Sequence, residues 1–369
     1  MININDKLKK KALEIISMSG SFCSSLQPSS PLFTEPIAIN RSNKRLGPMN
    51  LLAIVILSRG KCGLCKCVTC YLVAMAVADL TVVIIEVILK RINNIYLPIH
   101  FLFITPICAM KLVTKMLALN CSVWFTVAFT FDRFVSICCQ NFRRIYCTQR
   151  TANLVVATVC LLSCLKSIPF YFIYQPKLII NKIPYFCIET AAYYTSPLWT
   201  ADEWFDSIST PLVPIFFILL FNALTAKHIL KSNIVRRALI SHINNQNDTE
   251  SENWKRSMIL LFTLSANFIL LWMTHVVHSL MWRVTNYNYT NKYYSNTIYI
   301  TQQTGYMLQL LSSCSNTCIY GLTQRKFREE LRNGMKCIQL PLQPTNVVSE
   351  ELQLGICDTS GTLAQWSTP

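Results

Sequence analysis

Four cysteines between residues 62 and 70 form the densest group of potential metal ligands in the chain. They make two C-x2-C pairs, Cys62 with Cys65 and Cys67 with Cys70. Known zinc folds separate two such pairs by about a dozen residues or more, whereas only Lys66 intervenes here. This spacing disfavours a zinc site. Lipid attachment beside the basic residues and a plain tight turn remain as alternatives, and the sequence favours the turn.

Asp132 and Arg133 are adjacent charges near the end of a long apolar stretch, AFTFDRFVSICC. Charges within an apolar membrane helix are expensive and therefore usually serve a function. The simpler explanation is an interfacial anchor, because an arginine near a helix end reaches water readily. The pair by itself does not decide between these two readings.

Cys108 lies 25 residues before Arg133, which corresponds to about 37 Å along an α-helix. It should therefore lie at the opposite membrane face from Arg133. Cys187, in an acidic link outside the apolar stretches, is the other cysteine well placed to meet it there. An oxidising exterior would allow a disulfide, which would pin this link over the helix of Cys108.

The elements that must position these residues are long apolar blocks. The chain of 369 residues is 52% hydrophobic and 14% charged, whereas soluble domains carry about 25% charged residues. A membrane helix needs about 20 apolar residues, and six blocks have that length: 71–89, 101–139, 153–174, 208–230, 257–282 and 297–322. A shorter run, 49–58, precedes them. We expect an all-α membrane protein, because continuous apolar blocks exclude a β-barrel.

Positive charge gathers in alternate links between these blocks. The net charge is +16, and the basic links lie around residues 59–66, 143–150, 227–256 and 325–332. This distribution predicts that these links are cytoplasmic, and that the N-terminus and the link 175–206 are extracellular. It also argues against nucleic-acid binding. Residues 1–45 have too short an apolar core for a signal peptide, so we expect an atypical extracellular leader.

Short motifs in a fixed order carry a resemblance to a receptor family. They are Asn50 in NLLAIVIL, Asp79 in AMAVADL, Asp132 and Arg133 in DRF, Phe268 and Trp272 in FILLW, and Asn316 and Tyr320 in SNTCIY. From Asn50 to Cys337 the chain resembles the class A, rhodopsin-like G-protein-coupled receptors, and within them an orphan group described as probable G-protein-coupled receptor 139-like. The resemblance implies a bundle of seven transmembrane helices over residues 46–322. It also implies a short amphipathic eighth helix over 323–337 and a cytoplasmic tail over 338–369.

The chain departs from the pattern of that family at several helices. Thr274 and Thr317 stand where prolines are usual in the sixth and seventh helices. These helices should bend by other means or bend less, because proline removes a backbone hydrogen bond. The sequence before Asn50, AINRSNKRLGPM, is not half of a membrane helix. We therefore expect a truncated or atypical first helix, which bears on surface expression.

The resemblance implies two groups of functional residues inside the spans. Near mid-membrane, a polar cluster that binds sodium in the family corresponds to Asp79, Ser122, Ser312, Ser313 and Asn316. A buried carboxylate there must be protonated or hold a cation, and a hydrogen-bonded network without an ion is the alternative. The switch that couples to a heterotrimeric G protein corresponds to Asp132, Arg133, Asn222, Trp272, Asn316 and Tyr320.

Polar residues nearer the outer face suggest a ligand pocket. They are Glu86, Lys111, Lys115, Trp272, His275, His278, Gln302, Gln303 and Tyr306. Lys115 stands where amine receptors have an aspartate, so a monoamine is disfavoured, and an amino-acid-like or peptide ligand with a carboxylate fits better. The alternative is an ion pair of Glu86 with Lys115 or Lys90 that has no ligand role.

We therefore expect a plasma-membrane receptor that binds an extracellular ligand and activates a G protein, with arrestin and membrane lipids as further partners. We expect no enzyme activity and no cofactor other than allosteric sodium. Glycosylation is expected at Asn40 and Asn288, and palmitoylation at Cys337. The alternatives are a non-signalling relative or faulty gene model, and a transporter or channel, for which the chain lacks the usual internal repeat.

Overall fold

The computed structural model describes residues 50–60, 62, 64–92, 100–240, 248–284 and 296–339. The leader 1–45 and the tail beyond residue 339 lie outside the described residues, and so do Asn40, Asn288 and the side chain of Cys337. The predictions for these segments and modification sites stay predictions.

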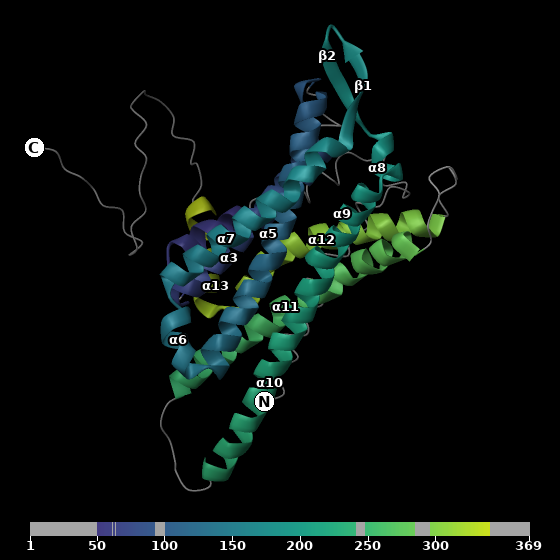
Figure 1. Cartoon of the computed structure of the whole chain (residues 1–369). Coiled ribbons are helices and arrows are strands. Elements are labelled where there is room, and N and C mark those ends of the chain that lie inside the picture. The colour runs from purple at the N-terminus through teal and green to yellow at the C-terminus, as the bar shows by residue number, and fades with distance from the viewer. Residues whose placement is uncertain are drawn as a thin grey trace, which may run out of the picture.

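Helices form a bundle, with a single β-hairpin projecting from one end (Figure 1). The long helices are α3 (Lys66–Val83), α5 (Thr105–Cys138), α7 (Gln149–Ser167), α10 (Val213–Ile240), α11 (Asp248–Val284) and α12 (Asn296–Thr323). Shorter helices are η2 (Ile84–Ile92), η3 (His100–Phe103), α6 (Gln140–Tyr146), η4 (Ile168–Ile173), α8 (Ala191–Thr195), α9 (Pro197–Ser207), η5 (Ile208–Leu212) and α13 (Arg325–Gln339). The strands are β1 (Tyr174–Ile180) and β2 (Ile183–Glu189), and residues 50–58 form the described part of the first helix.

Five helical stretches in the described part of the chain are long and apolar enough to cross a membrane: Lys66–Lys90, Thr105–Cys138, Gln149–Ile173, Pro197–Ser232 and Met258–Met281. They correspond to the first five predicted blocks. The sixth block is also helical, as α12, but it is not among the five. Its sequence explains this difference, because serine, threonine, glutamine and asparagine interrupt its apolar residues.

The outer link expected over residues 175–206 is shorter in the structure. Pro197 lies in the first turn of α9, a position where proline is compatible with a helix. The helix then continues through the π-helical turn η5, which contains Pro211, into α10. The span therefore begins at Pro197 rather than at 208, so the acidic residues Asp202, Glu203 and Asp206 belong to a helix. The apolar block failed to show this because these acids interrupt it.

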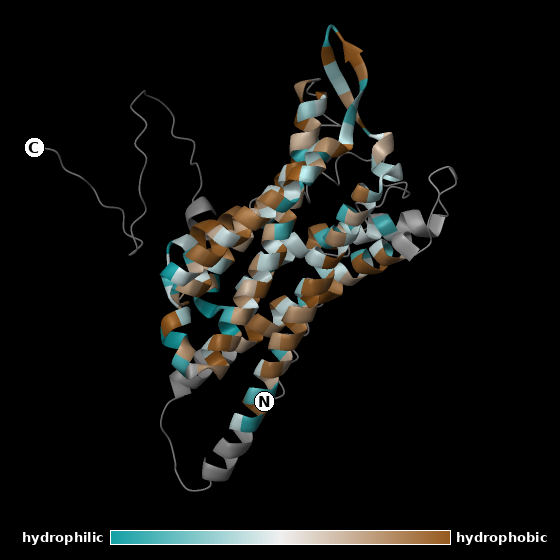
Figure 2. Ribbon diagram, in the orientation of Figure 1, coloured by the Kyte–Doolittle hydropathy of each residue, from teal (hydrophilic) through white to brown (hydrophobic). Residues whose placement is uncertain are grey.

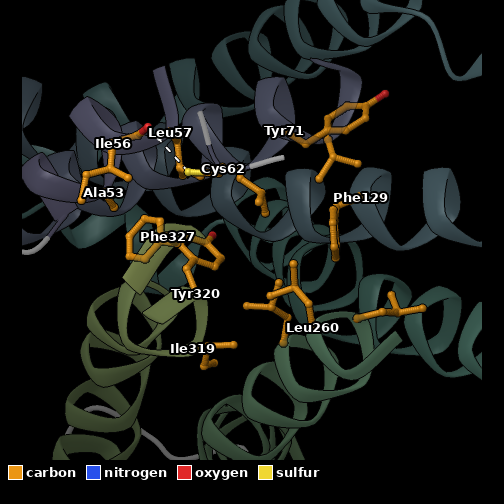
Figure 3. Packing of buried hydrophobic residues seen from close by; sticks show 14 of the residues in the cluster. Ala53, Ile56, Leu57, Cys62, Tyr71, Phe129, Leu260, Ile319, Tyr320 and Phe327 are labelled. Atoms are coloured by element: carbon orange, nitrogen blue, oxygen red, sulfur yellow. Dashed lines mark hydrogen bonds between the residues drawn. The ribbon is translucent and has the colours of Figure 1, made fainter. Parts of the chain in front are cut away.

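Helix α5 lies at the centre of the bundle, in contact with α3, α7, α10 and α11. Apolar side chains from both ends of the sequence meet at one end of α5 (Figure 3). This cluster includes Ile56 and Leu57 of the first helix, Tyr71 of α3, Phe129 of α5, Leu260 of α11, Tyr320 of α12 and Phe327 of α13. The short described part of the first helix is thus buried against α12 and α13, which stabilises it by removing apolar area from water.

Asn50 joins the first helix to α12. Its side-chain nitrogen donates to the carbonyl of Ser313 at 3.1 Å, and its oxygen accepts a hydrogen bond from the Thr317 hydroxyl at 2.7 Å. Thr317 is one of the residues that replace a family proline. Both α11 and α12 are continuous α-helices through the replaced positions, Thr274 and Thr317. At the second position the threonine hydroxyl supplies a contact between helices that proline could not make.

Hydrophobic residues are frequent along the helices of the bundle (Figure 2), and many of their side chains are exposed. Helix α7 is the extreme case, since only 17% of its most apolar window is buried inside the protein. Its exposed side chains include Leu154, Leu161, Leu162 and Leu165. A helix with this surface suits contact with lipid tails rather than water.

Candidate functional site

A large cavity of about 1620 Å³ opens between the hairpin and the outer halves of the helices. Eight of the nine predicted ligand-pocket residues line it: Glu86, Lys111, Lys115, Trp272, His275, His278, Gln302 and Tyr306. The ninth, Gln303, is in α12, but its side chain lies outside the described residues. The structure therefore brings together side chains from η2, α5, α11 and α12 that are far apart in the sequence.

Glu86 forms ion pairs with two lysines in this cavity. Its carboxylate lies 2.8 Å from the Lys115 ammonium and 3.3 Å from the Lys90 ammonium. The Lys115 side chain is only 17% exposed, whereas that of Lys90 is 61% exposed. Lys115 also lies 5.3 Å from the centre of the Tyr306 ring. Both ion pairs considered from the sequence are thus present, so the charge of Lys115 is largely balanced before any ligand arrives.

A second charged group, which the sequence did not reveal, centres on Lys166 of α7. Its ammonium lies 2.8 Å from Asp206 of α9 and 3.1 Å from the side-chain oxygen of Asn120. It also bonds Thr210, whose hydroxyl donates to Asn120 at 2.6 Å. Lys166 is a charged residue inside the apolar block 153–174, and this position was the available signal. Its partner was hidden because Asp206 was assigned to a link rather than to a helix.

The β-hairpin covers the cavity. Strands β1 and β2 pair antiparallel, and the two turn residues, Asn181 and Lys182, both have positive φ, of 50° and 65°. Such a turn matches the twist of a two-stranded hairpin. A disulfide joins Cys187 of β2 to Cys108 of α5, the pairing expected from the sequence. Thr105 of α5 adds a hydrogen bond to the carbonyl of Phe186 at 3.2 Å. The hairpin is therefore held over α5.

Acidic side chains occupy the hairpin and α9 side of the cavity. Glu189 accepts a hydrogen bond from Tyr194, and Glu203 accepts one from Tyr193. Burial, with the nearby charge of Glu203, raises the pKa of Glu189 above its ordinary value. Together with Asp206, these carboxylates give this side of the cavity a negative charge.

Aromatic rings lead from the outer cavity toward the centre of the bundle. Trp272 lines the cavity, and its ring centre lies 5.3 Å from that of Phe268, with the two rings tilted against each other. On its other side lie His275, at 5.9 Å from Trp272, and Tyr306, at 5.9 Å from His275. Tyr306, His275 and Trp272 therefore form a continuous series of ring contacts at the cavity.

The predicted mid-membrane cluster is assembled around Asp79, which is completely buried. Its carboxylate accepts hydrogen bonds from the Ser122 hydroxyl at 2.6 Å and from the Asn316 amide at 2.8 Å. A small cavity of about 10 Å³ is lined by these two partners of Asp79, by Ser312 and Ser313, and by apolar side chains that include Leu119, Leu264, Phe268 and Trp272. That is about the room needed by one water molecule.

The opposite end of the bundle holds Asp132 and Arg133. They pair with each other at 2.5 Å, and both are buried. Tyr320 of α12 donates to the sulfur of Met75 at 3.5 Å. The side-chain oxygen of Asn222 has no hydrogen-bond partner among the described residues.

Residues 49–320 match the family model described as 7 transmembrane receptor (rhodopsin family). The chain belongs to the rhodopsin family of seven-transmembrane receptors. This match covers most of the chain, from the first helix through α12. Membership confirms the all-α bundle expected from the sequence, and it makes the chain a receptor rather than an enzyme.

Curated relatives of this rhodopsin-family chain include thyrotropin-releasing hormone receptors. The receptor of Bos taurus is 23% identical over 326 residues, which cover 80% of this chain and 77% of the bovine protein. The Homo sapiens receptor has the same identity and coverage. The Mus musculus receptor is 22% identical, covering 84% of this chain and 81% of its own. The similarity to the orphan group named above remains a prediction.

Family membership also sets the general setting of the receptor. Receptors of this family are multi-pass proteins of the plasma membrane, and the family works through an extracellular ligand and a G-protein partner. The identity of the ligand and the orientation of this chain are not decided by membership.

Proposed function

We propose that this receptor binds a zwitterionic ligand, such as a free amino acid or a short peptide, in the cavity beneath the hairpin. The observation that carries the proposal is the separation of charge within that cavity. The η2 and α5 side presents Lys90, Lys111 and Lys115 against Glu86, a sum of three positive charges and one negative. The hairpin and α9 side presents Glu189, Glu203 and Asp206 against Lys177, three negative charges and one positive.

A ligand with both charges complements this arrangement better than one with a single charge. A carboxylate would be attracted to Lys111 and Lys115, and an ammonium group to the opposite acidic side. Counting the neighbouring Lys166, which pairs with Asp206, the second side keeps a net negative charge of one. A monoamine lacks the carboxylate and would leave the net positive charge of the η2 and α5 side uncompensated.

We propose that the hairpin end of the bundle faces the extracellular space. The Cys108–Cys187 disulfide supports this orientation, because disulfides persist in oxidising compartments. The basic residues at the other end, including Arg143, Arg144 and Arg328, suit the cytoplasmic side. This orientation places the N-terminus outside.

The ligand would act by binding the active arrangement better than the resting one. Movement of Trp272 would let the inner end of α11 swing outward, releasing Arg133 to meet the G protein, with Tyr320 and Asn222 as its new supports. Arrestin would use the same opened face. The free oxygen of Asn222 supports this role, since a buried polar atom without a partner is costly in the resting state.

The decisive experiment is a panel of amino acids, dipeptides and monoamines read by nucleotide exchange on G proteins in membranes. Each active compound is repeated as its amide, which lacks the carboxylate, and as its N-acetyl form, which lacks the ammonium. We expect zwitterions to activate and both blocked forms to lose at least about tenfold in potency, the cost of one charge-assisted contact. Equal potency of the blocked forms would refute the zwitterion proposal.

The same assay separates signalling from the alternatives. Arg133→Ala should abolish exchange while surface labelling stays unchanged. A chain retained inside the cell would fit the non-signalling relative instead, and substrate flux in vesicles without nucleotide exchange would fit a transporter.

We also propose that sodium binds beside Asp79 and favours the resting state. The residues fit this ion, since a carboxylate with spare acceptor capacity and several hydroxyl groups supply the oxygen ligands that hard cations prefer. Sodium should lower agonist potency in the original receptor and leave the potency of an Asp79→Asn variant unchanged. Equal sodium dependence in both would favour the ion-free network.

A further inference from the structure

Two of the four cysteines between residues 62 and 70 lie against the charged pair Asp132–Arg133. Cys65, the residue that precedes α3, places its sulfur 3.4 Å from the Arg133 guanidinium. The sulfur of Cys67 lies 3.3 Å from that of Cys65 and 3.9 Å from the Asp132 carboxylate. The spacing of these cysteines thus has a structural consequence that neither a turn nor a metal site explains.

A third thiol approaches the same pair from another element. Cys147, between α6 and α7, donates to the backbone carbonyl of Asp132 at 3.8 Å. Among the described residues, no group of three or more histidine, cysteine and acidic side chains is arranged to hold a metal ion. The cluster is therefore better understood as a set of thiols around an arginine than as a zinc site.

Cys65 has the environment of a reactive cysteine. Its side chain is exposed, whereas Cys67 is buried. A hydrogen bond from Cys67, together with the positive charge of Arg133, lowers the pKa of the Cys65 thiol to about 5. Partial shielding of this sulfur from water by its neighbours raises the pKa, but by less. A thiolate at this position is both the counter-charge of Arg133 and the nucleophile that electrophiles meet first.

We propose that Cys65 and Cys67 form a redox-sensitive pair that restrains Arg133, and that hydroperoxides release the restraint by oxidising the pair to a disulfide. The Cys65 thiolate attacks one peroxide oxygen, which forms a sulfenic acid and expels an alkoxide. The Cys67 thiol then attacks the Cys65 sulfur, and hydroxide leaves with the proton of Cys67 as water. In sum, two thiols and one hydroperoxide become a disulfide, an alcohol and a water molecule.

Formation of this bond removes the thiolate from Arg133. The two sulfurs must approach from 3.3 Å to about 2.05 Å, and the product carries no charge. Arg133 then keeps its pairing with Asp132 but loses its contact with the thiolate of Cys65, the residue before α3. Hydrogen bonds to charged groups contribute more than neutral ones, so losing the thiolate should weaken the restraint on Arg133. Basal nucleotide exchange should therefore rise about fivefold. This second consequence rests on the proposed function, whereas the thiol chemistry does not.

The thiol chemistry is tested first, on the intact receptor in detergent. After limited hydrogen peroxide, mass spectrometry should find residues 65 and 67 joined and two hydrogens lighter, and in Cys67→Ser a Cys65 sulfenic acid trapped by dimedone. Alkylation of Cys65 by iodoacetamide should change little between pH 8 and pH 6, whereas an ordinary thiol slows about tenfold for each pH unit. Cys139, a half-buried thiol at the end of α5, provides the internal reference.

Signalling is tested in the same preparation. Peroxide should raise basal exchange in the original receptor and in Cys139→Ser, and leave it unchanged in Cys65→Ser. Several results would overturn the proposal: oxidation of Cys139 as fast as Cys65, a lipid thioester on Cys65, or a disulfide formed without a change in exchange. If the disulfide forms but no sample, oxidised or not, shows any nucleotide exchange, the result counts against the proposed function instead.

Discussion

Glu86 illustrates how single residues in the cavity divide their roles. It pairs with Lys115, which is nearly buried, and with Lys90, which is mostly exposed. Exposed ion pairs contribute little, because water screens them and the side chains lose entropy. Removing one partner of a buried pair leaves an uncompensated charge, which costs much more. The two lysines therefore form a natural comparison around one carboxylate.

Lys115→Ala should lower ligand potency by at least about tenfold, because it removes a positive charge from the pocket and exposes Glu86 to the ligand. Lys90→Ala is the matched control and should change potency by less than about threefold, as expected of a surface pair. Both variants are compared by concentration–response curves at equal surface expression. Similar effects of the two substitutions would show that Lys115 has no ligand role.

Lys166 and Asp206 permit a test of stability by a double-mutant cycle. Lys166→Met and Asp206→Asn should each lower the thermal stability of the receptor in detergent, since each leaves a largely buried charge without its partner. The double variant should lose less than the sum of the two, with a coupling energy of about 1–3 kcal/mol. Additive losses would mean that the ion pair does not connect α7 to α9.

Helices α11 and α12 pack against each other along their length, and glycine makes the closest approach possible. A Cβ atom added at Gly305 would lie 3.2 Å from the Cα atom of His275, so the α11 backbone would have to move. At Gly321, further along α12, an added Cβ atom would meet nothing within 4 Å. Close packing therefore requires a glycine at residue 305, whereas the space around residue 321 would admit a larger side chain.

Gly305→Ala should destabilise the receptor and weaken ligand binding, because His275 lines the cavity. Gly321→Ala should be neutral or stabilising by up to about 1 kcal/mol, because alanine is the better helix former. Thermal unfolding in detergent measures both. A stabilised Gly305→Ala variant would show that the two helices are not in close contact there.

Thr317→Val tests the link between the first helix and α12. The substitution preserves shape but removes the hydroxyl that Asn50 accepts from, leaving a completely buried oxygen unsatisfied. We expect a loss of about 1–3 kcal/mol in stability. Because this hydrogen bond joins the first helix to α12, surface expression should fall as well. Thr323→Val, on the same helix, is the control, since its hydroxyl donates locally to the Ile319 carbonyl.

At the scale of the whole molecule, the Cys108–Cys187 disulfide ties two segments separated by 79 residues. In the entropic description, closing a loop of that size lowers the conformational entropy of the unfolded chain and so raises its free energy by about 4 kcal/mol. The same bond holds the hairpin, which carries Glu189, against α5 at the cavity. One covalent bond therefore contributes to the stability of the bundle and to the charge separation on which the ligand proposal depends.

Cys108→Ala/Cys187→Ala should lower thermal stability and reduce the response to zwitterionic ligands by more than about tenfold, because the hairpin is no longer held at the cavity. Cys160→Ala/Cys164→Ala, which removes two exposed free thiols of α7, should leave both properties unchanged. Unfolding curves and nucleotide exchange provide the two measurements. An unaltered ligand response would show that the hairpin does not form the pocket.

Local pattern explains which predictions succeeded. Apolar block length is a property of consecutive residues, so it predicted the class, most spans and the positions of Asp79, Glu86, Lys115 and Arg133 along their helices. Block length failed where acidic residues interrupt the signal, in α9. The rise per residue of a helix predicted how deep a residue lies in the membrane, but it could not predict which neighbouring helix its side chain faces.

The sequence by itself determined a helical membrane receptor and the depth of its polar residues, because hydropathy and motif order are readable along one chain. Only the tertiary structure decided the partners: Lys166 with Asp206, Asn50 with Thr317, and Cys65 with Arg133. Such contacts join residues 40 to 267 positions apart, with the shortest of the three being the salt bridge across α7 and α9 and the longest the Asn50–Thr317 bond. They depend on how helices rotate against one another, which the packing of the whole bundle sets.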